Sequence, residues 1–256
     1  MEPAFEWRLW ALVNGVPAFL GGLLFIGAPL VRRIFAGVGI GLPDWIGFFD
    51  QRFAWDIRER RDALLLGVGY IFRGLLFVAV LVAASWSEAR WIVLGNVAFA
   101  AVLLIVTMVW GDLFHWRRPT AIGWLFLYIE EPVWMLTLVP RAEAAAGVIP
   151  AGPGLPLVVV GLLLVEAAVT FGLAVYLFFV APRPPDRVSP RILAGFALGW
   201  TGWSISLAMA NTWNDAQWGI GLNLLWLAGS ALVLLLTRRR PSPVVALETG
   251  MEMPDE

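Results

Sequence analysis

Four ionisable side chains stand inside long apolar stretches of the sequence: Arg73, Glu130, Glu131 and Glu166. Counted at about 1.5 Å per residue from the expected helix ends, all four lie near the middle of a bilayer. A charge at that depth is costly unless it is paired, hydrated or neutralised, so these groups are expected to face the inside of a helix bundle. One arginine cannot balance three carboxylates. We therefore predict a midplane charge cluster in which at least one glutamate is protonated or a bound cation completes the balance.

This cluster is open to a structural and a functional interpretation. Arg73 could pair with one glutamate and fix the helix packing, while the other acids stay protonated and hydrogen-bonded. Alternatively, the group could relay protons or cations, or hold a carboxylic acid ready to protonate a ligand. Glu130 and Glu131 are about 100° apart on a helix, so they point at one spot only if the helix is distorted. Pro132 could supply such a distortion.

A second polar pair, Asp112 and His115, falls at the inner end of the third apolar stretch. Three residues apart, they would share one face of a helix, where Asp112 could orient His115 at a point of proton uptake. The alternative is that both simply cap a helix at the membrane surface. Asn14, Asn96, Asn211 and Asn223 are further polar groups, and we expect them to hydrogen-bond across helices.

The chain holds 15 tryptophans, most of them near the expected membrane boundaries. That placement is typical of interfacial aromatic belts. Trp134, Trp200, Trp203 and Trp226 lie deeper, and a belt does not explain them. They either pack between helices or line a cavity for an apolar ligand.

Gly195 and Gly199 stand one helical turn apart in the sixth apolar stretch. Such a pair of small residues lets another helix approach closely. The approaching helix could belong to this chain or to a partner.

Trp110, Asp112 and the Glu130–Glu131 pair resemble a short part of the membrane lycopene cyclases. The resemblance implies an acid that protonates a polyene, with tryptophan faces stabilising the resulting cation. A fused cyclase would carry a second acid pair, which this sequence lacks. A pigment-bearing microbial rhodopsin is excluded because the chain has no lysine to bind retinal.

The elements that carry these residues follow from composition. Apolar residues make up 60% of the 256 and charged residues only 14%, with a mean hydropathy of +0.78. A soluble domain needs about a quarter of its residues charged. Apolar runs long enough to cross a bilayer as helices recur along the chain, whereas the short alternating segments of a barrel are absent. We predict an all-α membrane protein with about seven spans: 9–31, 63–84, 91–114, 121–139, 155–181, 192–210 and 218–237.

The arginines show how these spans thread the membrane. All 18 basic residues are arginine. Alternate loops place 14 on one side and three on the other, and such an excess marks the cytoplasmic side. The N-terminus is thus expected outside and the C-terminus in the cytoplasm of the cell (inner) membrane. The cytoplasmic arginines lie in segments 32–61, 117–118, 183–191 and 238–240, and the outer ones are Arg8, Arg90 and Arg141.

Residues 1–240 are expected to form one transmembrane domain, and 241–256 an acidic, disordered tail. The long segment 34–62 divides in two. Residues 34–49 are apolar but interrupted by glycine and proline, which indicates an interfacial or re-entrant piece, and 50–62 indicate a charged helix on the cytoplasmic face. The loop 140–156 is expected to be irregular.

Several functions are excluded by composition. The absence of cysteine rules out thiolate chemistry and iron–sulfur clusters, and a single histidine rules out bis-histidine haem. We predict no metal and no cofactor, although a bound lipid or apolar pigment is compatible with the sequence. Membrane lipids and other membrane subunits are the expected partners, and nucleic acid is not.

Three functions remain. The favoured one is a non-catalytic subunit or assembly partner of a larger membrane complex, for instance an energy-converting one. The others are a small proton- or cation-coupled transporter using the midplane cluster, and an enzyme acting on an isoprenoid or lipid.

Overall fold

The computed structural model describes residues 3–147, 152–181 and 188–237. Within these ranges the regular elements are helices, and the only β-type pairing is an isolated bridge between Arg52 and Asp56. In chain order they are α1 (Pro3–Gly37), α2 (Asp44–Gly47), α3 (Arg60–Val82), α4 (Trp86–Val109), the 3₁₀ turn η1 (Gly111–Leu113), α5 (Pro119–Ala146), α6 (Leu157–Val175) with its π-helical continuation η2 (Tyr176–Val180), α7 (Ser189–Ala208) and α8 (Trp213–Thr237).

Long apolar helices dominate the fold, which confirms a helical, multi-pass membrane protein. Six of them are long and apolar enough to cross a bilayer: α1, α3, α4, α5, α6 with η2, and α8. The seventh long helix, α7, is not among these six, and much of it is buried against its neighbours. Each predicted span coincides with one long helix. The ends differ by up to seven residues: α5 continues to Ala146, beyond the expected end at 139, and α4 stops at Val109 and not at residue 114.

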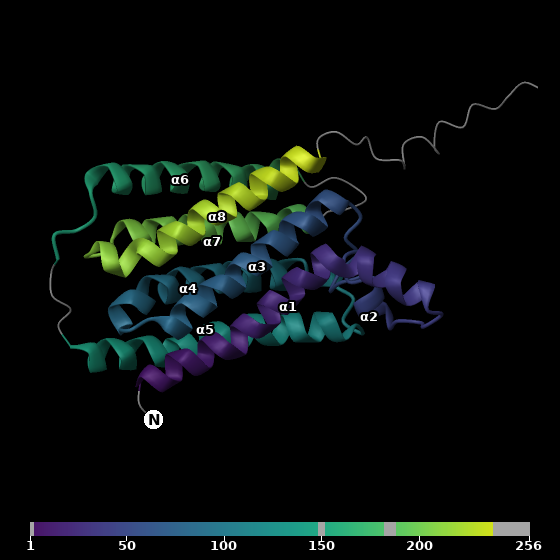
Figure 1. Cartoon of the computed structure of the whole chain (residues 1–256), viewed down its shortest axis with the longest axis horizontal. Helices are drawn as coiled ribbons and strands as arrows, with labels where there is room; N and C mark the ends of the chain where they lie inside the picture. The colour runs from purple at the N-terminus through teal and green to yellow at the C-terminus, as the bar shows by residue number, and fades with distance from the viewer. Residues whose placement is uncertain (1–2, 148–151, 182–187, 238–256) are drawn as a thin grey trace, which may run out of the picture.

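The long helices form layers that Figure 1 shows nearly edge-on. Helices α1 and α5 lie on one side, α3 and α4 in the middle, α7 and α8 beyond them, and α6 at the far edge. The main contact of α6 is with α7. Consecutive long helices run in opposite directions (Figure 1), so α1 begins at one end of the bundle and α8 finishes at the other. We refer to these as the N-terminal end and the C-terminal end of the bundle.

Tryptophans and charges join the helices at the N-terminal end of the bundle. The rings of Trp7 and Trp86 stack with centroids 5.1 Å apart, and both side chains are buried. Arg141 Nη1 donates to Glu6 Oε1 at 3.0 Å, which connects α5 to α1. Some tryptophans expected at the interface therefore pack between helices.

At the C-terminal end, the segment between α2 and α3 folds back onto the bundle. The prediction of a charged helix over 50–62 is wrong, because helix α3 begins only at Arg60 and residues 48–59 form turns, bends and irregular structure. Phe49, Phe53 and Trp55 in this segment are buried. The ring of Trp55 contacts Trp124 of α5, with the two ring centroids 5.1 Å apart. Burial of these large aromatic side chains outweighs the helical pattern of the charged residues around them.

The loop between α5 and α6 begins later than predicted. Helix α5 continues through Pro140 to Ala146, and the chain leaves it at Gly147, whose φ of 67° suits glycine. The part of the predicted loop at 148–151 and the predicted tail at 241–256 lie outside the described residues.

Gly195 and Gly199 of α7 lie where this helix approaches α4. A Cβ on Gly195 would come within 2.2 Å of Leu103 Cδ2, and one on Gly199 within 2.4 Å of Phe99 Cδ2. The helix that comes close to these glycines is thus α4 of the same chain. Gly172 of α6, by contrast, has open space where its Cβ would be.

We predict that Gly199→Ala destabilises the fold by about 1–3 kcal/mol, because the methyl group would force α4 and α7 apart. Gly172→Ala should be neutral or stabilising by up to about 1 kcal/mol, since alanine favours helix and meets nothing there. Thermal unfolding of both variants in one detergent measures the difference. Equal stability of the two would contradict the close α4–α7 approach.

Candidate functional site

A buried ionic network connects α3, α4 and α5 near the middle of the bundle. Arg73 and Glu131 form an ion pair, with 4% of the arginine and none of the glutamate exposed. Arg73 Nη2 donates to Glu131 Oε2, and Asn96 Nδ2 donates to Oε1. Arg73 Nε also donates to Asn96 Oδ1 at 3.2 Å. Both carboxylate oxygens of Glu131 therefore have donors, which is the condition for keeping an ion pair out of water.

Aromatic side chains surround the cation. The guanidinium carbon of Arg73 lies 4.7 Å from the ring centroid of Phe99 and 5.3 Å from that of Phe77. Arg73 Nη1 donates to the Tyr128 hydroxyl at 3.4 Å, and that hydroxyl is 3.0 Å from the hydroxyl of Tyr70. A desolvated guanidinium is attracted by ring faces, so these contacts add to the ion pair.

Glu130 does not join this network. Being the next residue on α5, it points in another direction, and its carboxylate lies near Asn14 of α1. Within the described part of the chain, neither of its buried oxygens has a hydrogen-bond partner. Asn14 instead donates to the carbonyl of Trp10 in its own helix. The adjacent glutamates thus have different surroundings, with one paired and the other not.

Glu166 belongs to a separate polar group between α6, α7 and α8. Asn223 Nδ2 donates to Glu166 Oε2 at 3.1 Å and lies 3.2 Å from Ser204 Oγ. The four ionisable residues predicted to share a level therefore occupy three places, and only Arg73 and Glu131 bond to each other. Asn96 and Asn223 do make the cross-helix hydrogen bonds expected of them.

The placement of Asp112 and His115 on one helix face is wrong. Helix α4 ends at Val109, Asp112 is exposed in η1, and His115 follows that turn. The partner of His115 is Asp56, whose Oδ2 is 3.4 Å from Nε2, while Arg118 Nη1 is 2.9 Å from Asp56 Oδ1. Burial raises the pKa of Asp56, but Arg118 and His115 outweigh it and hold this pKa below the ordinary value. The ion pair between Asp56 and Arg118 therefore stabilises the C-terminal end at neutral pH. This stabilisation is lost only as the pH falls through the lowered pKa of Asp56.

The deep tryptophans form a stack between α7 and α8. The Trp200 ring is stacked on both Trp226 and Trp203, with ring centroids 4.1 Å and 5.8 Å apart, respectively. All three side chains are buried. Trp134 is partly buried and packs against the core. These four tryptophans fill space between helices and do not line the cavity described next.

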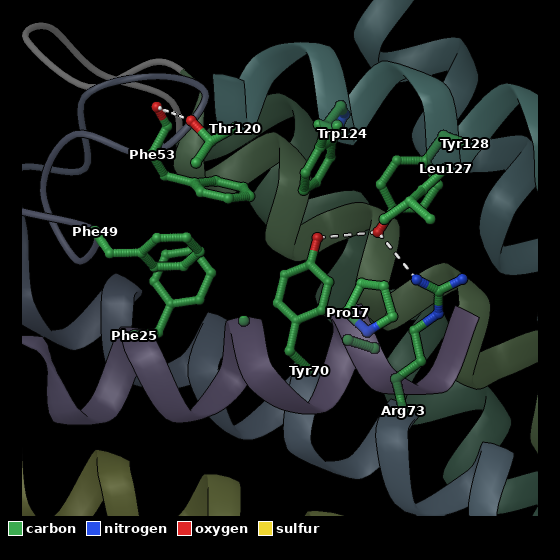
Figure 2. A pocket seen from close by; sticks show the side chains of 13 residues that line it. Pro17, Phe25, Phe49, Phe53, Tyr70, Arg73, Thr120, Trp124, Leu127 and Tyr128 are labelled. Carbon is green, nitrogen blue, oxygen red and sulfur yellow. Dashed lines mark hydrogen bonds between the residues drawn. The ribbon is translucent and has the colours of Figure 1, made fainter. Parts of the chain in front are cut away.

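A cavity of about 160 Å³ lies between α1, α3, α5 and the segment 48–59 that folds back onto the bundle. Figure 2 shows Phe25, Phe49 and Phe53 at one end of it and Arg73 with Tyr128 at the other. Thr120 Oγ1 donates to the carbonyl of Phe53 at 2.9 Å and fixes the segment to α5 (Figure 2). The lining residues are Pro17, Ala18, Gly21, Phe25, Phe49, Phe53, Tyr70, Arg73, Thr120, Gly123, Trp124, Leu127 and Tyr128.

Tyr70 and Tyr128 are the site residues that sequence reasoning did not single out. The chain has only three tyrosines, and these two stand in the interior of α3 and α5. Tyrosines of the interfacial belt lie near helix ends. A tyrosine in the interior of an apolar helix therefore indicates a buried hydroxyl with a hydrogen bond, and the sequence alone contains this information.

Glu131→Leu should destabilise the protein by about 3–5 kcal/mol, because it leaves Arg73 buried without its counter-ion. Adding Arg73→Leu should recover much of that loss, since neither charge then remains in the core. Reversible unfolding in mixed micelles measures both. A double variant no more stable than Glu131→Leu alone would show that the uncompensated charge of Arg73 is not the cause of the lost stability.

Comparison with protein-family models, characterised proteins and solved structures gave no match. Among the residues that the structure describes, no three acidic or histidine side chains gather in a way that could hold a metal ion. The geometry of the buried network and of the cavity is therefore the basis for assigning a function.

Proposed function

We propose that this chain is a seven-span protein of the cell (inner) membrane that serves as a non-catalytic subunit or assembly partner of a larger membrane complex. The N-terminus lies outside and the C-terminus in the cytoplasm. Among the described residues, most of the arginines lie at the C-terminal end of the bundle, in segments 32–61 and 117–118 and at Arg191, in agreement with that orientation. Counting α7 as a span gives an odd number of crossings, which agrees with the opposite ends at which α1 begins and α8 finishes (Figure 1).

The observation that carries the proposal is the saturation of the Arg73–Glu131–Asn96 network. An acid that relays protons or protonates a substrate needs access to water or ligand. Glu131 has no exposed surface, and both of its oxygens accept hydrogen bonds from the neighbouring helices. Its surroundings support a role in fixing α3, α4 and α5 together.

Helix α6 supplies the surface on which another subunit would pack. It lies at the edge of the bundle, and its main contact is with α7. Leu162, Val165 and Val169 are 66%, 62% and 63% exposed and follow one stripe of the helix. A second transmembrane helix could cover this stripe without disturbing the rest of the fold.

The orientation can be tested with single cysteines, because the natural chain contains none. Ala84→Cys lies in the turn before α4, and Gln51→Cys lies in the segment at the C-terminal end. We expect a membrane-impermeant maleimide to label residue 84 in intact cells and residue 51 only after the membrane is opened. The reverse pattern would invert the topology, and equal labelling of both would refute the alternation.

Copurification tests the assembly. The chain extracted with its surrounding lipid by a polymer should carry partner polypeptides in constant stoichiometry. Val165→Trp should reduce that stoichiometry, whereas Leu232→Trp, at a similarly exposed position on α8, should leave it unchanged. Mass analysis of the particles gives the result. A chain that stays alone under every mild condition contradicts the proposal.

A second candidate, proton or cation transport, is favoured by the unpaired oxygens of Glu130 and by the polar group around Glu166. Carboxylates inside the membrane often mark the proton or ion pathways of pumps and transporters. A chain found alone in the copurification experiment would shift the assignment to this function. Isoprenoid protonation is less well supported, because none of the thirteen cavity-lining residues is acidic.

A further inference from the structure

We infer that the cavity between α1 and α5 binds the ring of a lipid-soluble quinone that enters sideways from the bilayer. This inference needs only the membrane placement of the chain and does not depend on its assembly with other subunits. Four features carry it: where the cavity opens, what size and kind of ligand its walls accept, which polar group they offer, and how deep in the membrane that group lies.

The cavity opens toward the lipid-facing side of α1 and α5. Among its lining residues only Pro17 of α1 and Gly123 of α5 are exposed. The apolar side chains of Leu20 and Ile122 flank this opening and are 53% and 59% exposed. Gly123 presents no side chain, and a Cβ there would meet nothing within 4 Å. A molecule dissolved in the hydrocarbon would therefore meet an open mouth between the two helices.

The walls suit one six-membered ring. An apolar cavity of about 150 Å³ stays dry and holds a benzene molecule, and this cavity measures about 160 Å³. The rings of Phe25, Phe53 and Trp124 offer faces and edges for stacking (Figure 2). The space is too small for a whole polyene or a phospholipid, so a long tail would have to remain in the bilayer.

The tyrosine pair offers one hydrogen-bond donor to the ligand. Each hydroxyl has one proton, and the bond between Tyr70 and Tyr128 uses only one of the two. The Arg73 guanidinium donates to Tyr128, so it accepts neither proton. Within the described residues no other acceptor bonds to these hydroxyls, which leaves one O–H at the cavity wall without a partner. A carbonyl oxygen would satisfy it.

The depth of that donor identifies the source of the carbonyl. Tyr70 is ten residues into α3, about 15 Å from the helix start, and so near the midplane. The ester carbonyls of phospholipids lie in the interfacial regions, outside a hydrocarbon core about 30 Å thick, and do not reach this level. The acceptor must belong to a neutral molecule that dissolves in the bilayer interior. A quinone combines a flat ring, carbonyl oxygens and an apolar tail.

The test is calorimetric titration of the isolated, detergent-purified chain with a decyl-substituted benzoquinone and, for comparison, with decylbenzene. We expect saturable quinone binding and binding at least about tenfold weaker for decylbenzene, which has no acceptor oxygen. Gly123→Leu should abolish quinone binding by filling the mouth. Gly161→Leu, at an equally open glycine on α6, should bind like the parent.

The tyrosines are tested together, because either hydroxyl can supply the proton. Tyr70→Phe with Tyr128→Phe should weaken quinone binding on the order of tenfold and leave decylbenzene unaffected. Absence of saturable quinone binding by the folded parent overturns the inference. So does equal affinity for the two probes, or full binding by Gly123→Leu. Because the isolated chain is used, these outcomes do not depend on whether it assembles with partners.

Discussion

The constraint on which the fold depends is the cost of an unpaired charge in a medium of low polarity. Arg73 and Glu131 meet that cost together, with Asn96 satisfying the remaining oxygen, and the three residues belong to three different helices. Because a guanidinium and a carboxylate bond only at short range and in defined directions, α3, α4 and α5 are fixed at one level relative to each other. Glu131 is thereby withdrawn from the cavity. The polar side chains at its wall are then Tyr70, Tyr128, Arg73 and Thr120.

Much of the fold could be predicted from the sequence because the bilayer limits the choices. Only helices satisfy the backbone in lipid, so apolar length was enough to locate each long helix, although its ends could be up to seven residues away. Depth along a helix can be counted in the same way. The prediction that Arg73 and a glutamate lie at a similar level rests on this count, and the ion pair requires it.

The place of each helix in the bundle, and the neighbours that its side chains face, could not be predicted in this way. Depth gives Glu166 the same level as Arg73, but α6 lies at the far edge of the bundle, and there its carboxylate meets Asn223. The aromatic segment 48–59 shows a related limit. Its charges suggest a surface helix, and only the space that α1, α3 and α5 leave at the C-terminal end explains why Phe53 and Trp55 turn inward. Such facts depend on tertiary packing, which local patterns do not contain.

The burial of α7 among its neighbours bears on how the protein is made. This helix carries Ser204 and Thr201 along with its glycines, and it is suited to contact protein more than lipid. Its serine, threonine and glycine residues gain less from contact with lipid than leucine or isoleucine would. Its main neighbour α4 precedes it in the chain, so the face formed by Phe99 and Leu103 is already in place when the ribosome delivers α7. Biosynthetic insertion of this helix should therefore rely on an earlier one as its receptor, and damage to α4 would be expressed as failed integration of α7.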